Sequence, residues 1–214
     1  ERRVDRVVVS GITPSLDPEA RVTGNSYRLA ANQGLSFIGS YVLGMGFTME
    51  PAEAAAFIEK DPRNKDVLFP YLNGEDLNSR PDCSASRWII NFGDMDLNEA
   101  KSYVEPLEIV RREVKPQRDL LPDYKKRVRD NWWKYEHQAK PLYSAITGLE
   151  RVIVITRVSK TVMPVMVPTG QVFSEALVVF ATDDTAMLAL LSSSPHYWWA
   201  VSRASSMKAD LRYT

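Results

Sequence analysis

Cysteine and histidine, the usual zinc ligands, are rare in this 214-residue chain. It has one cysteine, Cys83, and two histidines, His137 and His196, which lie far apart in the sequence. Because a zinc site needs several such ligands at short spacings, the usual zinc motifs are excluded. No Gly-x-Ser-x-Gly nucleophile elbow is present either. We therefore expect no catalytic or metal-binding residue in this group, and we expect both histidines to be packing or surface residues.

Asp94 and Asp96 form the pattern that best suits a catalytic metal. Paired carboxylates at the end of a strand hold the divalent cation of metal-dependent nucleases. The same pattern arises where a strand ends and an aspartate accepts hydrogen bonds from the first N–H groups of a helix. A nuclease would also need a lysine nearby in strand register, and none follows. The helix-cap explanation applies equally to Asp183-Asp184, which precedes an apolar run.

Cationic and hydroxyl side chains gather in three stretches. In the first, strand alternation places Arg157 and Ser159 on one face, and Lys160 follows them. Arginine can read guanine through two parallel hydrogen bonds, and serine can read a base edge. The second stretch, residues 125–129, reads Lys-Lys-Arg-Val-Arg and fits either a phosphate backbone or a solvated helix face. The third is the strip 202–214, which carries three cations and several hydroxyl groups.

The elements that must position these side chains follow from periodicity and turn residues. Short β-branched runs at 151–159, 161–168 and 175–182 predict a sheet. Apolar spacing predicts helices over 97–147, interrupted by prolines, and over 185–208. The predicted fold class is therefore mixed α/β (α+β), with a mixed or antiparallel sheet flanked by helices.

The first half of the chain is less regular. We expect a short strand at the N-terminus, a loop over 12–34 and a glycine-kinked strand over 35–47. Its three glycines do not have the Gly-x-Gly-x-x-Gly spacing of a dinucleotide-binding loop. A helix follows, with Thr48 as a possible cap, Pro51 in its first turn and its end at Asp61-Pro62. Beyond it, Asn73-Gly74 predicts a turn and 86–94 predicts a buried strand.

The aromatic residues Trp132, Trp133 and Tyr135 have two explanations. They could stack on the bases of a nucleic acid. Burial of an amphipathic helix against the sheet is more common, and we expect these residues to pack inside the fold.

Composition limits the partners. The 27 basic and 27 acidic residues give no net charge, so any basic site must be local. No apolar run approaches the roughly 20 residues of a membrane span, and we expect no membrane partner. The single cysteine excludes an internal disulfide and fits a reducing compartment, so we expect a cytoplasmic protein.

The order and spacing of several segments resemble a known family. They are SFIGSYVLGMGF, FPYLNGEDLN, RWIINFGDMDLNEA, YVEPLEIVRREVKPQR, NWWKYEHQAKPLYSAI, RVIVITRVSKT and MKADLRYT. Together they resemble the target recognition region of bacterial adenine-N6 DNA methyltransferases. More narrowly, they resemble type IIL restriction–modification proteins, to which the phage-defence methyltransferases of the BREX kind are related. The resemblance covers residues 36–214, and it implies that residues 1–35 are the tail of an upstream methyltransferase domain and its linker.

The resemblance implies a division of labour. An upstream catalytic domain would bind S-adenosylmethionine and methylate an adenine, and this region would dock on double-stranded DNA and position that adenine. The chain lacks the (Asn/Asp)-Pro-Pro-(Tyr/Phe) tetrapeptide and the glycine motif for the cofactor, so we expect no catalysis and no cofactor in this fragment. The candidates for base readout are Arg157, Ser159, Lys160 and Arg203. The candidates for backbone contacts are Lys125, Lys126, Arg127, Arg129, Ser205, Ser206, Lys208 and Arg212.

Two alternatives stay open at this point. The chain could be a nuclease that uses Asp94 and Asp96. It could also be a scaffold module whose Trp-rich helix docks on the catalytic domain. The recognised DNA sequence and the oligomeric state do not follow from the sequence.

Overall fold

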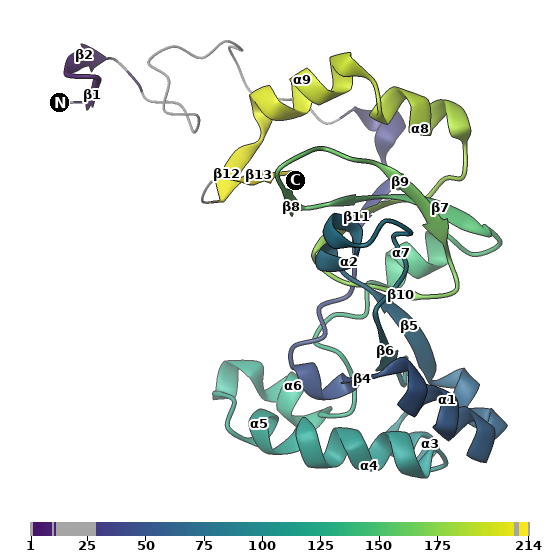
Figure 1. Ribbon diagram of the computed structural model, residues 1–214. Helices are drawn as coiled ribbons and strands as arrows, with labels where there is room; N and C mark the ends of the chain where they lie inside the picture. The colour runs from purple at the N-terminus through teal and green to yellow at the C-terminus, as the bar shows by residue number, and fades with distance from the viewer. Residues whose placement is uncertain (1, 10, 12–28, 208–209, 214) are drawn as a thin grey trace.

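Two four-stranded sheets, each with its own hydrophobic core, organise the chain in the computed structural model, which describes residues 2–9, 11, 29–207 and 210–213. Figure 1 shows one sheet in the lower lobe and the other in the upper lobe. The mixture of helices with antiparallel and mixed sheets confirms the predicted fold class. In the described part of the chain, no helix is long and apolar enough to cross a membrane.

The lower lobe is built on a mixed sheet in the order β10-β5-β6-β4. Its strands are β4 (Thr48–Met49), β5 (Leu68–Leu72), β6 (Arg87–Ile90) and β10 (Val172–Phe173). The helices and 3-10 turns of this lobe are α1 (Pro51–Lys60), α3 (Leu97–Ala100), α4 (Val104–Glu113), α5 (Lys115–Asp119), α6 (Lys126–Asp130), η2 (Met45–Phe47), η3 (Pro62–Asp66) and η4 (Asp123–Lys125). Phe47, Ile89 and Val110 are fully buried in its core.

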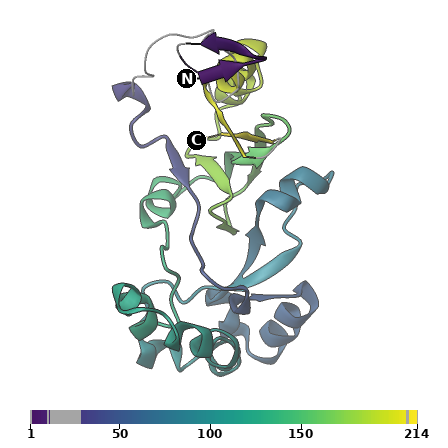
Figure 2. The same cartoon turned by 90° about the vertical axis from the view of Figure 1, so that its left-hand side faces the viewer.

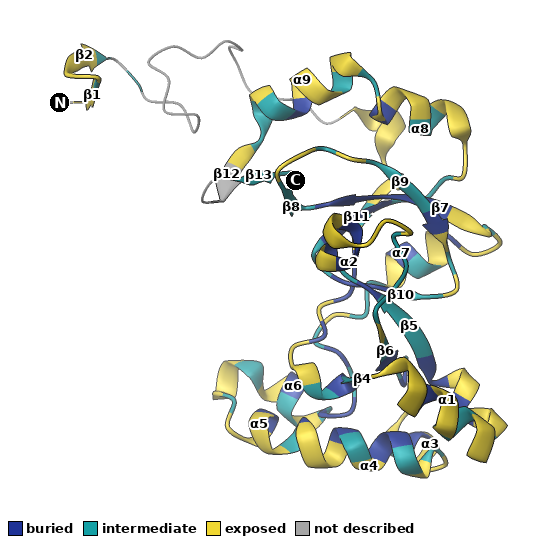
Figure 3. Ribbon diagram, in the orientation of Figure 1, coloured by how far each residue is buried: buried dark blue, intermediate teal, exposed yellow. Residues whose placement is uncertain are grey.

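The upper lobe is built on an antiparallel sheet in the order β3-β11-β7-β9. Its strands are β3 (Ser36–Ile38), β7 (Arg151–Thr156), β9 (Val165–Pro168) and β11 (Leu177–Phe180). Its helices are α2 (Gly74–Ser79), α7 (Lys140–Ala145), α8 (Thr185–Leu191) and α9 (Ser194–Arg203), with the 3-10 turn η1 (Ala30–Asn32) before β3. Five consecutive residues of β7 are buried, because α7 lies on one side of the sheet and α8 and α9 on the other (Figures 1 and 3).

Strand β10 joins the two cores. It pairs in parallel with β5, Val172 opposite Tyr71 and Phe173 opposite Leu72. Successive residues of a strand point to opposite faces. Val172 and Tyr71 therefore pack with the lower core, whereas Phe173 and Leu72 pack in the upper core. One two-residue step along a strand pair thus links both halves of the molecule.

A smaller three-stranded sheet lies at the edge of the upper lobe. It has the order β12-β13-β8, all antiparallel, with β8 at Val158–Ser159, β12 at Ser205–Met207 and β13 at Asp210–Arg212. We call it the C-terminal sheet. Separately, β1 (Arg2–Val4) and β2 (Val7–Val9) form a hairpin whose turn residues Asp5 and Arg6 both have positive φ.

Several expected elements have different bounds in the structure. The single N-terminal strand is a hairpin, because the chain reverses at Asp5-Arg6. The strand predicted over 35–47 is regular only in β3, because the chain turns through positive φ at Leu43 and Gly44 before η2. Most of the predicted loop 12–34 lies outside the described residues, and 30–32 form η1.

Two helix expectations also need correction. Helix α1 begins at Pro51 as predicted, but its N-cap is Glu50, and the Thr48 hydroxyl instead donates to the Met45 carbonyl. The expected turn at Asn73-Gly74 is the start of α2, because the Asn73 side chain accepts from the N–H groups of Glu75 and Asp76. The chain forms α8 and α9 as predicted, but α9 ends at Arg203, and 205–207 pair as a strand instead of continuing to 208.

Arg118 is the most buried charged residue of the lower lobe, with 2% of its surface exposed. Its guanidinium donates to the main-chain carbonyls of Val42 and Leu43 on one side and of Asn131, Trp132 and Lys134 on the other. It also lies 5.1 Å from the centre of the Phe47 ring. Burial lowers the pKa of Arg118 to about 10, which leaves the group charged at neutral pH. The planar fork can serve two groups of carbonyls at once.

We predict that Arg118→Ala lowers the free energy of unfolding by about 3 kcal/mol or more, because it leaves several buried carbonyls without a donor. The free energy of unfolding of Arg118→Lys should lie between those of the wild type and Arg118→Ala, since one ammonium cannot reach both groups of carbonyls. Urea denaturation of both variants measures the effect. The matched control is Arg112→Ala, which removes an exposed side chain of α4 and should change the free energy of unfolding by no more than about 0.5 kcal/mol. Equal losses at both positions would refute the role of Arg118.

Candidate nucleic-acid interface

The C-terminal sheet brings together two segments that are about 50 residues apart in the sequence. Leu211 lies opposite Ser159 and Arg212 opposite Val158. Ser205 in turn lies opposite Arg212, and Arg203 ends α9 just before β12. The structure therefore places the predicted residues Arg157, Ser159, Lys160, Arg203, Ser205 and Arg212 on or beside one small sheet. Ser206 belongs to β12, and Lys208 lies outside the described residues.

Arg157 occupies the bend between β7 and β8. One nitrogen of its guanidinium donates to the Glu175 carbonyl at 2.9 Å and to the Tyr41 hydroxyl at 3.4 Å. Its main-chain N–H donates to the Ala176 carbonyl at 2.8 Å. The side chain is half-buried, its Nε is buried, and these contacts hold its guanidinium at one terminal nitrogen. The Arg157 guanidinium is therefore a donor whose position is fixed. Lys160, three residues later, is exposed.

The end of the C-terminal sheet is held against α9 by Tyr213. Its N–H donates to the Arg157 carbonyl at 2.8 Å, which continues the pairing of β13 with β8. Burial raises the pKa of Tyr213 to about 12, so the hydroxyl keeps its proton and can donate to His196 Nε2 at 3.1 Å. The other His196 nitrogen, Nδ1, lies 2.6 Å from the Leu191 carbonyl, to which it must donate. His196 is thus a packing residue, as predicted.

The cationic stretch 125–129 lies in the other lobe. Figures 1 and 2 place α6 at the opposite end of the molecule from the C-terminal sheet. Lys125 pairs with Glu136 at 3.0 Å, and Arg129 contacts Asp123 and the Leu121 carbonyl. Arg127 and Lys126 are both exposed, but the Arg127 guanidinium donates to the Glu136 carbonyl. The residues of this stretch that are predicted to contact the DNA backbone therefore do not share a surface with the C-terminal sheet. Among them, Lys126 is the one best placed for contact with solvent.

The two aspartates of the nuclease alternative have structural partners. Asp96 caps α3 by accepting from the N–H groups of Asn98 and Glu99 at 2.7 and 2.9 Å. These hydrogen bonds lower the pKa of Asp96. Asp94 pairs with Lys140 at 2.5 Å. The structure favours the helix-cap explanation, and the same holds at Asp184, which caps α8.

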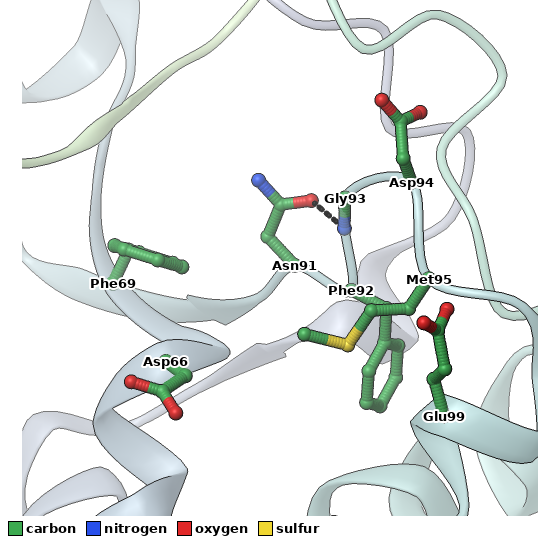
Figure 4. Close-up of a pocket in the computed structure, with 8 residues that line it drawn as sticks. All are labelled: Asp66, Phe69, Asn91, Phe92, Gly93, Asp94, Met95 and Glu99. Carbon is green, nitrogen blue, oxygen red and sulfur yellow. Dashed lines mark hydrogen bonds between the residues drawn. The ribbon is translucent and has the colours of Figure 1, made fainter.

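A pocket of about 470 Å³ beside Asp94 carries three carboxylates, which stand apart on different walls (Figure 4). Asp66 accepts from the Tyr103 hydroxyl, and Glu99 accepts from the Asp96 N–H in the capping box of α3. Within the described residues, no three His, Cys, Asp or Glu side chains are grouped so that they could hold a metal ion. The carboxylates of this pocket are thus engaged in local structure.

The aromatic stretch is buried, as expected. Trp132 and Trp133 are 7% and 8% exposed, and Tyr135 is 4% exposed. Trp133 donates to the Met95 carbonyl, and Tyr135 donates to the Ile90 carbonyl. These rings are therefore not a stacking surface for bases, nor a docking surface for another domain.

Two glycines of the segment 39–46, Gly39 and Gly46, serve close packing, whereas Gly44 has a positive φ and open space around it. A Cβ at Gly39 would lie 2.1 Å from the Ser174 carbonyl oxygen, and one at Gly46 would lie 2.6 Å from Glu113 Cβ. No room for a bound nucleoside is left beside Gly39 or Gly46. These two glycines therefore do not form the S-adenosylmethionine site that the resemblance implies for a catalytic domain.

Sequence reasoning missed the residues that hold the predicted ones in place, namely Asn78, Tyr41, Glu175, His196 and Tyr213. Asn78 accepts from the Ser159 hydroxyl across 81 positions, and Tyr41 contacts Arg157 across 116. No local pattern reports contacts at such separations.

Two comparisons with known proteins found a match to this chain. The model of the family described as MmeI, target recognition domain, matches residues 18–214. The fold is similar to that of the type IIL restriction-modification enzyme MmeI, solved in complex with DNA, with a TM-score of 0.72 and 17% identity. That similarity covers 96% of this chain and 27% of the MmeI chain. No curated protein matches the chain. Because the family model spans nearly the whole sequence, the resemblance seen in the sequence is confirmed: the chain belongs to the MmeI target recognition domain family.

Proposed function

We propose that this chain recognises a specific sequence of double-stranded DNA for a restriction–modification protein. One observation carries the proposal: the C-terminal sheet joins the two cationic segments that the sequence predicts separately. Membership of a target recognition family, and the DNA in the solved MmeI complex, support the same function. Arginine and lysine on a firmly held sheet edge can donate to base edges in the major groove, and a serine hydroxyl can accept from them.

The proposed roles divide between two surfaces. Arg157, Ser159, Lys160 and Arg203 read bases from the C-terminal sheet, and Ser205, Ser206, Lys208 and Arg212 contact the backbone beside them. Lys126 and its neighbours in 125–129 contact phosphates further along the duplex, from the other lobe. Phosphate contacts fix register and base contacts specify sequence, so the two surfaces would contribute differently to binding.

The parent protein would supply the chemistry. The chain spans 27% of the MmeI chain, and we propose an upstream domain that binds S-adenosylmethionine and methylates adenine at N6. In this proposal residues 1–35 are the tail of that domain and its linker, residues 36–214 are the recognition domain, and the protein acts in the cytoplasm, where its DNA substrate and a reducing environment are found.

Firm support of the C-terminal sheet matters for this function. A donor reads a base only if its own position is fixed, because a loosely held side chain adapts to any base. Tyr213 supplies that support through its contacts with Arg157 and His196.

We predict that the logarithm of the affinity for duplex DNA falls linearly with the logarithm of the salt concentration, because phosphate contacts release counterions. Lys126→Ala should weaken binding on every sequence and reduce the salt slope by about 1. Fluorescence anisotropy at several salt concentrations measures both. Lys65→Ala in η3, beside α1 and away from α6, is the control and should change neither. Equal effects of the two substitutions would remove Lys126 from the interface.

We predict that substitution of Arg157 reduces discrimination between DNA sequences but leaves the overall affinity for DNA nearly unchanged. Arg157→Lys keeps the charge but loses the planar fork, so the preference for one base should fall by about 1–3 kcal/mol while binding to unrelated duplexes stays nearly constant. Competition among duplexes that differ at single positions measures this. A uniform loss on all duplexes would instead make Arg157 a backbone contact.

For Tyr213 we predict that Tyr213→Phe speeds amide hydrogen exchange in β13 and lowers discrimination between duplexes. The change removes one hydrogen bond, worth about 1 kcal/mol, that holds the strand end. The control is Tyr197→Phe on α9, which is 36% exposed. Unchanged exchange at Leu211 and Arg212 in the Tyr213 variant would show that the strand does not depend on this contact.

A further inference from the structure

Asn78 stands beside the C-terminal sheet, although it comes from a distant part of the chain. It belongs to the last turn of α2, whose start is fixed by the capping box of Asn73 and Asp76. Gly74 brings the helix close to the sheet of the upper lobe, since a Cβ there would lie 3.0 Å from Thr156 and 3.3 Å from Ala176. Asn78 itself is exposed. Helix α2 lies near β8 in Figure 1, and the contacts of Asn78 with Val158 and Ser159 place its side chain next to that strand.

The orientation of the Asn78 amide follows from its two contacts. Nδ2 lies 3.4 Å from the Val158 carbonyl oxygen, which can only accept. Oδ1 lies 2.9 Å from the Ser159 hydroxyl. That hydroxyl already accepts from the Thr161 N–H, so its proton is available for Asn78. The amide nitrogen must therefore be on the Val158 side, and its oxygen on the Ser159 side.

This arrangement changes what each residue offers to DNA. The proton of Ser159 is used within the protein, so Ser159 has only a lone pair left for a base. The Asn78 nitrogen has two protons, and only one of them can point at the Val158 carbonyl. A fixed, exposed donor is thus available on Asn78, beside the predicted reading residue.

We propose that Asn78 is a specificity-determining residue, and that Ser159 positions it. This inference rests on the proposed function. The Asn78 nitrogen donates to a base that presents an acceptor in the major groove, which guanine, adenine and thymine do on their own edge and cytosine does not. At one position of the recognised sequence, cytosine on the contacted strand is therefore rejected.

The test is selection of bound duplexes from a random library by this chain, followed by affinity measurements on single-position variants of the selected motif. Asn78→Asp has the same shape but replaces the donor with an acceptor, which suits the amino group of cytosine. We expect the preference at one position to shift toward cytosine by about 5- to 150-fold, with the other positions unchanged. Ser159→Ala should broaden the preference at that same position, because the amide loses its fixed orientation.

The matched control is Asn98→Asp, an exposed asparagine of α3 in the lower lobe, which should leave the motif unchanged. Thermal unfolding checks that each variant is folded, and Asn78→Ser serves as the second variant, expected to flatten the preference at the same position. If the wild-type chain selects no motif, the proposed function fails and this inference fails with it. If it selects a motif that Asn78→Asp leaves intact, or weakens equally at every position, only the role of Asn78 is overturned.

Discussion

The pairing of β13 with β8 is the interaction on which the proposed recognition surface depends. Among the described residues, these segments are joined by two residue pairs, Leu211 with Ser159 and Arg212 with Val158, and by the Tyr213 N–H bond to the Arg157 carbonyl. Closing a loop of some 50 residues costs entropy that a few hydrogen bonds alone barely offset. The helices α8 and α9 pack together within that loop, and His196 contacts Tyr213 at the end of β13. Most of the entropy cost of ordering the loop is therefore already met by folding of the upper lobe.

The lower lobe contributes to the proposed surface by holding α6 in a fixed position relative to the upper lobe. Two features do this: the step of β10 from one core to the other, and Arg118, which ties the crossing segment at Val42-Leu43 to the loop that follows α6. Because both features use main-chain groups, they constrain where α6 lies whatever its surface residues are. A duplex that contacts both lobes would meet two surfaces at a set spacing.

Much of the fold follows from local sequence. The β-branched runs form β7, β9 and β11, Pro51 begins α1, and Asp96 and Asp184 cap helices, as local chemistry predicts. The errors occur where tertiary contacts decide. Residues 205–207 have no local reason to be a strand without β13 beside them. The chain turns at Leu43-Gly44 between two close-packed glycines, Gly39 and Gly46.

The candidate site divides in the same way. Residue type and alternation identify Arg157 and Ser159, but their partners Tyr41, Asn78 and Glu175 come from distant segments. The charge of the stretch 125–129 can be predicted from the sequence. Its position in the other lobe and its ion pairs with Glu136 and Asp123 cannot.

The half-buried strands β8 and β13 belong to neither hydrophobic core. Exchanging their outward side chains would therefore cost the fold little, since main-chain pairing and the tyrosine at its end hold the strands whatever residues they carry. In the proposed function, substitution at this edge would give new preferences for bases while the two cores stay as they are, so that binding preference and stability could evolve separately.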